Sequence, residues 1–286
     1  MGPFPPSADL ARAANLPRAH AALRALRSQR SLSFEPRVNH LQHPDSRSFE
    51  HVADLYERAR PEYPQEAVAW VSSELALGSE STIVDLGAGT GKLTRALLAI
   101  GGRVIAVEPG DAMRGELERA LPEVDALRGA AENIPLADAS VDCIAVGQAF
   151  HWFRHDEALP ELHRVLRPGG GLALLWNSRD HKKPVQRKIS DLISPFVPPG
   201  RPGPEHWADS LRQSPLFTKP EEAHFPWVQE LDADGLAARI GSVSFVAAAS
   251  PEARAELDAR LREVVARLGG VVDFPYVTDV YVSRVV

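Results

Sequence analysis

The most informative stretch of the sequence is residues 84–94, which read VDLGAGTGKLT. An apolar run over residues 82–86 leads into three glycines at alternate positions, Gly87, Gly89 and Gly91, and a helical pattern follows. A glycine turn between a strand and a helix lets the backbone approach a ligand closely and points the amide groups of the helix N-terminus outward. The stretch therefore predicts a ligand site, in preference to a tight turn with only a structural role.

The glycine spacing separates this loop from two nucleotide-binding motifs. Counted from Gly87, the nicotinamide motif G-x-G-x-x-G requires a third glycine where this chain has Lys92. The loop also lacks the P-loop spacing G-x-x-x-x-G-K-[ST]. We therefore expect Lys92 to face solvent in the first helical turn. The next apolar run, residues 104–107, ends at Glu108, whose carboxylate could accept hydrogen bonds from both hydroxyls of a ribose.

Short apolar runs alternate with helical patterns on both sides of the loop. The sequence predicts strands at 82–86, 104–107, 124–127, 141–146, 172–176, 222–231 and 276–286, and helices at 66–77, 92–100, 112–120, 155–166 and 251–268. Such alternation is typical of an α/β fold in which helices cover both faces of a mostly parallel sheet.

Length and charge bound the class of protein. The chain has 286 residues, of which 44% are hydrophobic and 24% charged, with a formal net charge of -6. Residues 1–45 carry six arginines against three acidic residues, a net charge of +3, so residues 46–286 carry -9. An acidic body disfavours a nucleic-acid partner, and no apolar run reaches the roughly 18–20 residues of a membrane helix.

The charge boundary also suggests how the chain is organised. We expect residues 1–45 to be a basic, poorly ordered extension, and residues 46–286 to form one domain. A lid over the active site and an organellar transit peptide are the alternatives for the extension. The lone Cys143 excludes an internal disulfide and a cysteine-based zinc site, and it fits a cytoplasmic protein without a metal. Because Cys143 falls in the predicted strand 141–146, we expect it to pack rather than react.

Four sequence blocks, in order, resemble the class I S-adenosylmethionine-dependent methyltransferases. They are DLGAGTG at 85–91, VEP at 107–109, GAAENIPL with SVD at 129–142, and LHRVLRPGGGL at 162–172. The resemblance is closest to the methyltransferase type 11 subgroup, including trans-aconitate-methyltransferase-like proteins. It implies a Rossmann-like, mostly parallel seven-stranded sheet with an antiparallel last strand. It also implies S-adenosylmethionine as the cofactor and a small-molecule methyl acceptor, such as a carboxylate or a hydroxyl.

The resemblance further implies roles for single residues. Gly87 and Gly89 would approach the methionine and ribose parts of the cofactor, Asp85 would lie near its ammonium group, and Glu108 would hold the ribose. The other implied cofactor contacts are Arg60, Ala88, Thr90, Pro109, Ala131, Glu132 and Gln148. The family often has an acid where this chain has Ala130, so Glu132 is expected to replace it at the adenine.

The segment after the fourth predicted strand, residues 147–153, reads GQAFHWF. It lacks the Asn/Asp-Pro-Pro-Tyr/Phe element common in methyltransferases that act on amino groups of planar bases, which further disfavours nucleic acid. His151 stands where the acceptor should approach, either as a general base or as a residue that orients the loop. A carboxylate acceptor needs no base because it is already ionised.

Tyr56 is the second candidate catalytic residue. It precedes Arg60 by four positions, so the two would share a helical face. Arg60 could meet a carboxylate of the cofactor or of an acidic acceptor, and a surface pair with Glu57 or Glu62 is the alternative. We expect residues 184–250 to build the acceptor pocket. A monomer or homodimer is expected, and a cofactor-binding protein of the same fold without methyl transfer is the alternative function.

Overall fold

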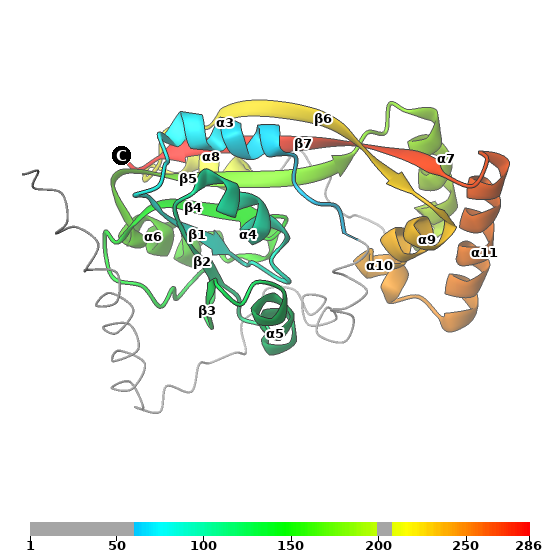
Figure 1. The fold of residues 1–286 in the computed structure, drawn as a ribbon, viewed down its shortest axis with the longest axis horizontal. Helices are drawn as coiled ribbons and strands as arrows, with labels where there is room; N and C mark the ends of the chain where they lie inside the picture. The colour runs from blue at the N-terminus through cyan, green and yellow to red at the C-terminus, as the bar shows by residue number, and fades with distance from the viewer. Residues whose placement is uncertain (1–59, 199–207) are drawn as a thin grey trace, which may run out of the picture. The chain divides into compact units, whose positions relative to one another are not determined.

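The computed structural model describes residues 60–198 and 208–286, so the predicted extension over 1–45 and Tyr56 lie outside the described residues. Seven strands form one sheet in the order β3-β2-β1-β4-β5-β7-β6 (Figure 1). They are β1 (Thr82–Leu86), β2 (Arg103–Val107), β3 (Asp125–Leu127), β4 (Val141–Gly147), β5 (Leu166–Arg179), β6 (Glu221–Leu231) and β7 (Val272–Arg284). Strands β1 to β5 pair in parallel, and β7 runs antiparallel to both β5 and β6. The predicted Rossmann-like sheet with an antiparallel last strand is confirmed.

The described helices follow the predicted pattern, with some additions. They are α3 (Gln65–Leu75), α4 (Lys92–Leu97), α5 (Asp111–Ala120), α6 (His155–Val165), α7 (Pro184–Ile193), α8 (Asp209–Gln213), α9 (Ala233–Gly241), α10 (Ser244–Ala247) and α11 (Pro251–Arg267). Helix α3 ends earlier than predicted because Ala76 adopts a left-handed conformation with φ 52°. Helices α7 to α10 were not among the predicted helices.

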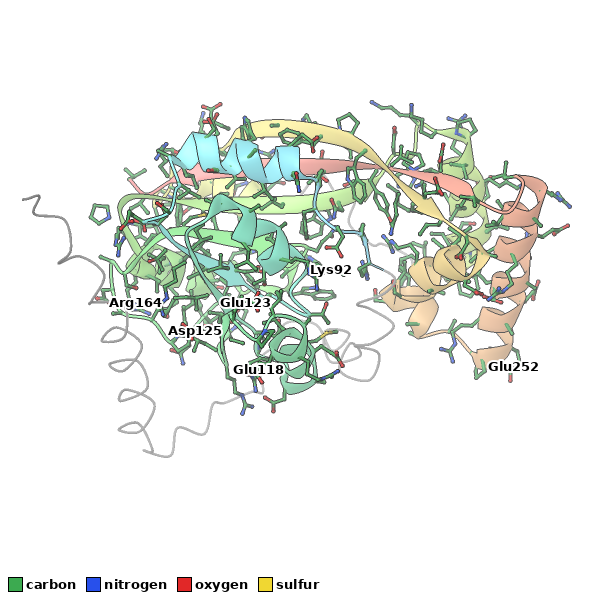
Figure 2. All side chains as sticks on the ribbon, in the orientation of Figure 1. Lys92, Glu118, Glu123, Asp125, Arg164 and Glu252 are labelled. Atoms are coloured by element: carbon green, nitrogen blue, oxygen red, sulfur yellow. The ribbon has the colours of Figure 1, made fainter. Side chains whose placement is uncertain are left out.

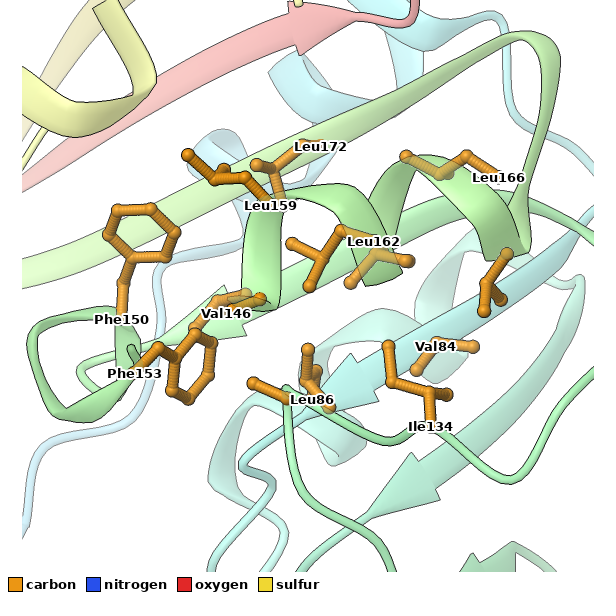
Figure 3. Packing of buried hydrophobic residues seen from close by; sticks show 14 of the residues in the cluster. Val84, Leu86, Ile134, Val146, Phe150, Phe153, Leu159, Leu162, Leu166 and Leu172 are labelled. Carbon is orange, nitrogen blue, oxygen red and sulfur yellow. The ribbon is translucent and has the colours of Figure 1, made fainter. Parts of the chain in front are cut away.

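Neighbouring residues in a strand point to opposite faces of the sheet. The central strands carry apolar side chains at both sets of positions, so they contribute to a core on each face. On one face, Leu159 and Leu162 of α6 pack against Val84, Leu86 and Val146 of the sheet (Figure 3). On the other face, α3 and α4 cover a cluster that includes Ile83, Val71, Leu97, Cys143 and Leu175. Cys143 is fully buried, and burial raises the pKa of its thiol to about 12, so the predicted packing role is confirmed.

A third core lies where β6 and β7 extend beyond the parallel strands. Helices α7, α9, α10 and α11 pack there around Phe274 and Tyr276 of β7, both of which are fully buried. Figure 1 shows these four helices gathered at one end of the long strands. This core contains much of the segment 184–250 that was predicted to surround the acceptor.

Arg164 of α6, which Figure 2 labels, holds the loop between β3 and β4 through several hydrogen bonds. Its guanidinium donates to the carbonyl oxygens of Leu136 at 3.0 Å and Ile134 at 3.2 Å. It also pairs with Asp138 at 2.6 Å and Glu161 at 2.7 Å. The Arg164 guanidinium holds the pKa of the Glu161 carboxyl below its ordinary value. One side chain therefore holds the loop that carries Ala131 and Glu132.

Replacing Arg164 by methionine should lower the free energy of unfolding by about 1 kcal/mol, because the loop loses several hydrogen bonds that are partly exposed to solvent. Urea unfolding measures this difference. Arg119→Met is the matched control, since Arg119 is 68% exposed and pairs with Glu116 on the surface of α5. Equal losses in the two variants would contradict the role given to Arg164.

Candidate functional site

A pocket of about 460 Å³, part of which is open solvent, lies at the carboxyl ends of β1, β4 and β5. Ligands of open α/β sheets bind at this edge. Its lining consists of Arg60, Pro61, Tyr63, Asp85, Gly87, Ala88, Gly89, Thr90, Lys92, Leu93, Gly147, Gln148 and Asn177. Seven of the residues predicted to bind the cofactor are therefore brought together here, namely Arg60, Asp85, Gly87, Ala88, Gly89, Thr90 and Gln148.

The glycine loop forms one wall of the pocket. Gly87, Gly89 and Gly91 have φ angles of 70°, 57° and 93°, in the left-handed region that favours glycine. The amide of Gly87 donates to the carbonyl of Val107 at 2.8 Å, which ties the loop to the end of β2. A Cβ atom at Gly87 would lie 2.8 Å from that of Ala149, whereas one at Gly89 would meet nothing within 4 Å. The backbone at Gly89 is thus open to close approach by a ligand.

Glu108 is hydrogen-bonded to this loop, and only 9% of its surface is exposed. Its Oε2 accepts a hydrogen bond from the amide of Gly89 at 2.8 Å, and its Oε1 accepts one from the amide of Gly110 at 2.8 Å. These two hydrogen bonds hold the carboxylate in place beside the loop. The role of Glu108 at the ribose stays a prediction.

Asp85 is the buried acid of the site, with 1% of its surface exposed. Thr94 donates its hydroxyl proton to Oδ2 at 2.6 Å, whereas Oδ1 is buried and has no hydrogen-bond partner in the described part of the chain. Burial raises the pKa of Asp85 to about 7; the charge of Glu108 adds to the rise and the Thr94 hydrogen bond opposes it. A buried carboxylate oxygen that has no hydrogen-bond partner and lies at the wall of a pocket is suited to bind a cationic group. Together with the glycine loop, it fits the ammonium end of S-adenosylmethionine.

Two cationic side chains line the pocket next to the loop. The prediction that Lys92 faces solvent is wrong, because its side chain is 14% exposed and its Nζ lies 2.6 Å from Oε1 of Glu62. This pair joins residues 30 positions apart, so local spacing could not reveal it. Arg60 donates from Nη2 to the carbonyl of Ser242, at the end of α9, at 2.9 Å.

Asn177 near the end of β5 completes the pocket, although it was not predicted as a site residue. It is 6% exposed, its Nδ2 donates to the carbonyl of Glu62 at 3.0 Å, and its Oδ1 accepts from Thr278 at 2.5 Å. Gln148 donates to the carbonyl of Asn177 at 2.9 Å and has a φ of 58°, which is uncommon outside glycine. The available sequence signal was a polar residue directly after an apolar strand.

Other predicted site residues are outside the pocket lining, which also lacks Glu108 and Pro109. Ala131 is 4% exposed and belongs to the core beneath α6. Glu132 accepts a hydrogen bond from the amide of Arg154 at 2.8 Å, at the start of α6. The ring of His151 lies 4.2 Å from that of Trp152 and 4.9 Å from that of Trp176. The adenine role of Ala131 and Glu132 and the catalytic role of His151 stay predictions.

Within residues 60–198 and 208–286, no cluster of three or more His, Cys, Asp or Glu side chains could hold a metal ion. No helix in the same ranges has the length and apolar composition needed to cross a membrane.

Known proteins resemble this chain over most of its length. A family model described as a methyltransferase domain matches residues 84–174. An uncharacterized methyltransferase of Mycobacterium tuberculosis is 37% identical over 238 residues, covering 82% of this chain and 93% of the relative. One of Schizosaccharomyces pombe is 37% identical over 242 residues, covering 82% and 94%.

The solved structures agree at the level of the fold. A protein described as a type II methyltransferase from Anaeromyxobacter dehalogenans has a TM-score of 0.60 and is 26% identical, covering 79% of this chain and 97% of its own. The segment matched by the family model runs from β1 into β5 and contains the glycine loop, Glu108 and Gln148.

Proposed function

Because the chain belongs to the S-adenosylmethionine-dependent methyltransferases of the type 11 family, we propose that it methylates a small molecule at an oxygen atom, such as that of a carboxylate or a hydroxyl. The observation that carries the proposal is a group of polar side chains that line the pocket together with the glycine loop. Gln148 and Asn177 lie at the ends of β4 and β5, and Arg60 lies in the segment before α3. A guanidinium and two amides suit an oxygen-rich acceptor or the carboxylate of the cofactor.

The residues of the chain would act mainly by positioning. S-adenosylmethionine, when bound, supplies a methyl group whose carbon can be attacked by a nucleophile, with the sulfonium sulfur as the leaving group. Gly87 and Gly89 would give the backbone approach, Asp85 would hold the cationic end, and Glu108 would hold the ribose. An ionised acceptor needs no base because it has no proton to lose, and alignment of the two reactants can supply up to roughly 7–11 kcal/mol of the barrier reduction.

His151→Asn should lower kcat less than about tenfold with a carboxylate acceptor, because general-base catalysis of about 10²–10⁴ is not required there. The residue would then orient the segment after β4 through its packing against Trp152 and Trp176. The measurement is kcat as a function of pH for the wild type and the variant. A loss above about a hundredfold, together with the disappearance of an ionisation from the pH profile, would show that His151 is a base.

The cofactor preference can be checked without knowing the acceptor. S-adenosylmethionine and S-adenosylhomocysteine should each raise the melting temperature of the purified protein, because a ligand that binds only the folded state stabilises it. NAD should raise it less, since position 92 is lysine where the nicotinamide motif requires glycine. Equal or greater stabilisation by NAD would overturn this preference.

Identifying the acceptor requires the detection of a methylated product. Incubating the protein with methyl-labelled S-adenosylmethionine and a metabolite extract, followed by mass spectrometry, should reveal a labelled ester or ether. The same product tests our proposal that the chain falls within the trans-aconitate-methyltransferase-like subgroup. A labelled nucleic acid, or cofactor binding without any labelled small molecule, would contradict the proposed function.

A further inference from the structure

Two arginines contact the same tyrosine, Tyr276, where β5 and β7 meet α9, and neither pairs with an acidic side chain in the described residues. Arg179 ends β5, and Arg239 lies in α9 with 5% of its surface exposed. Arg239 donates from Nε to the hydroxyl of Tyr276 at 2.6 Å, and Arg179 donates from Nη2 to the hydroxyl of Ser190 at 3.2 Å. Both partners are neutral.

Each of the two guanidinium groups also retains an unused donor. The Nη1 atoms of Arg179 and Arg239 are both buried, and neither has a hydrogen-bond partner among residues 60–198 and 208–286. Tyr276 links the two, because it is paired directly with Arg179 across the β5–β7 ladder and its ring lies 5.7 Å from the Arg239 guanidinium. Burial and the charge of Arg239 lower the pKa of Arg179 to about 10, so the Arg179 guanidinium still carries its charge at neutral pH.

Two like charges held close together away from solvent, without a counter-ion, raise the free energy of the folded state. A guanidinium group does not lose its proton at neutral pH, so it cannot lower this cost by becoming neutral. Unpartnered buried donors add to this penalty. An oxyanion between the two guanidinium groups would compensate their charge and accept hydrogen bonds from the unpartnered donors. Arginine presents parallel N–H donors that match carboxylate and phosphate oxygens. Tyr276 accepts from Arg239 and could donate its own hydroxyl proton to the same anion.

This cluster adjoins the cofactor pocket. Asn177 lines the pocket, and Arg179 lies two residues further along β5, on the same face of the sheet. Arg60 also lines the pocket and donates to the carbonyl of Ser242, whose hydroxyl donates to the carbonyl of Arg239 at 2.8 Å. A molecule that reaches the pocket between Arg60 and Asn177 would therefore have the two arginines at its far end.

We propose that Arg179 and Arg239 form an anion subsite that holds a carboxylate or phosphate group of the methyl acceptor while another part of the acceptor meets the cofactor. The role as an acceptor subsite rests on the proposed function, whereas anion binding itself does not. The acceptor would thus be a small molecule with an oxyanion at one end and the methylated group at the other.

The test is calorimetric titration of the full chain saturated with S-adenosylhomocysteine. Three probes are used, namely succinate, its uncharged diamide and inorganic phosphate. We expect saturable binding of succinate or phosphate and none of the diamide, and the stronger of the two anions identifies the source of the oxyanion. Arg179→Met and Arg239→Met should each weaken that binding by about tenfold or more.

Three controls make the outcome specific. Arg262→Met should bind the anion as the wild type does, because Arg262 is 45% exposed on α11 and is paired with Asp234 and Asp258. Both subsite variants should retain wild-type affinity for S-adenosylhomocysteine. If a methionine variant does not fold, Arg179→Lys and Arg239→Lys keep the charge but lose the paired donors, and they carry the same expectation of weaker binding.

The proposed subsite would be overturned if neither anion bound to the wild type. It would also be overturned if both subsite variants bound the anion with wild-type affinity. Failure of the wild type to bind S-adenosylhomocysteine would instead count against the proposed function, so the two failures are distinguishable. Labelled methyl transfer to a succinate-like acceptor that drops in the same variants, mainly through a higher KM, would support the acceptor role.

Discussion

Replacing Asp85 by asparagine is expected to stabilise the cofactor-free protein at pH 8 and, at the same time, to weaken its binding of S-adenosylhomocysteine. The wild-type carboxylate is buried, and its Oδ1 has no hydrogen-bond partner in the described residues. Keeping that group ionised at pH 8 is therefore unfavourable in the folded state. A neutral amide of nearly the same shape removes most of this penalty.

The sign of the pH dependence follows from the raised pKa. Asp85 has a pKa of about 7 in the folded protein against the ordinary value of 3.8, so the folded state binds more protons between these values. The contribution of Asp85 to stability is thus favourable below about pH 4 and is lost as the pH rises towards 7. Asp85→Asn should unfold with a free energy about 2–3 kcal/mol higher than the wild type at pH 8, with little difference at pH 4.

Ligand binding should show the opposite preference. A cationic ammonium group beside Asp85 favours the ionised carboxylate, so wild-type affinity for S-adenosylhomocysteine should fall as the pH drops below about 7. Asp85→Asn should bind more weakly at pH 8 and lose this pH dependence. Urea unfolding and calorimetric titration measure the two effects, with Asp125→Asn on the partly exposed strand β3 as the control. Wild-type affinity in Asp85→Asn throughout this range would remove Asp85 from the cofactor site.

Glu108→Ala should weaken S-adenosylhomocysteine binding by about 1–3 kcal/mol, or roughly fivefold to 150-fold in Kd. Two causes act together, because the ribose loses its acceptor and the amides of Gly89 and Gly110 lose the carboxylate that holds them. Glu108→Gln keeps one acceptor oxygen and should lose less. The control is Glu118→Ala, a surface substitution on α5 whose carboxylate is 57% exposed. Affinity unchanged in Glu108→Ala would mean that the ribose is held elsewhere.

The cofactor half of the site could be predicted because its residues are contiguous. Asp85 and the three glycines lie within one stretch of seven residues, 85–91, and Glu108 follows the next strand. The strand that carries Asn177 was predicted too short, at residues 172–176, whereas β5 spans Leu166–Arg179. Three consecutive glycines at 169–171 do not look like a strand, but pairing with β7 begins at Gly171. Tertiary pairing here overrides local preference.

The other half could not be predicted, because its contacts join distant segments. Asn177 and Thr278 are 101 positions apart, and Arg60 and Ser242 are 182 apart. No periodicity or local spacing links such residues. The same limit explains Lys92, whose pairing with Glu62 depends on the path of the chain before α3. Short helices such as α8 and α10 also escape prediction because a single turn carries too little periodic pattern.

The position of β7 has a consequence for how the chain folds during synthesis. β7 lies between β5 and β6 although it is made after both of them, and in the described part of the chain β6 pairs only with β7. While residues 272–284 are still inside the ribosome, β1 to β5 can already associate, but β5 and β6 each retain an unpaired edge. These edges of the nascent protein are therefore exposed to aggregation until the β7 segment emerges. Insertion of that segment closes both edges in one step.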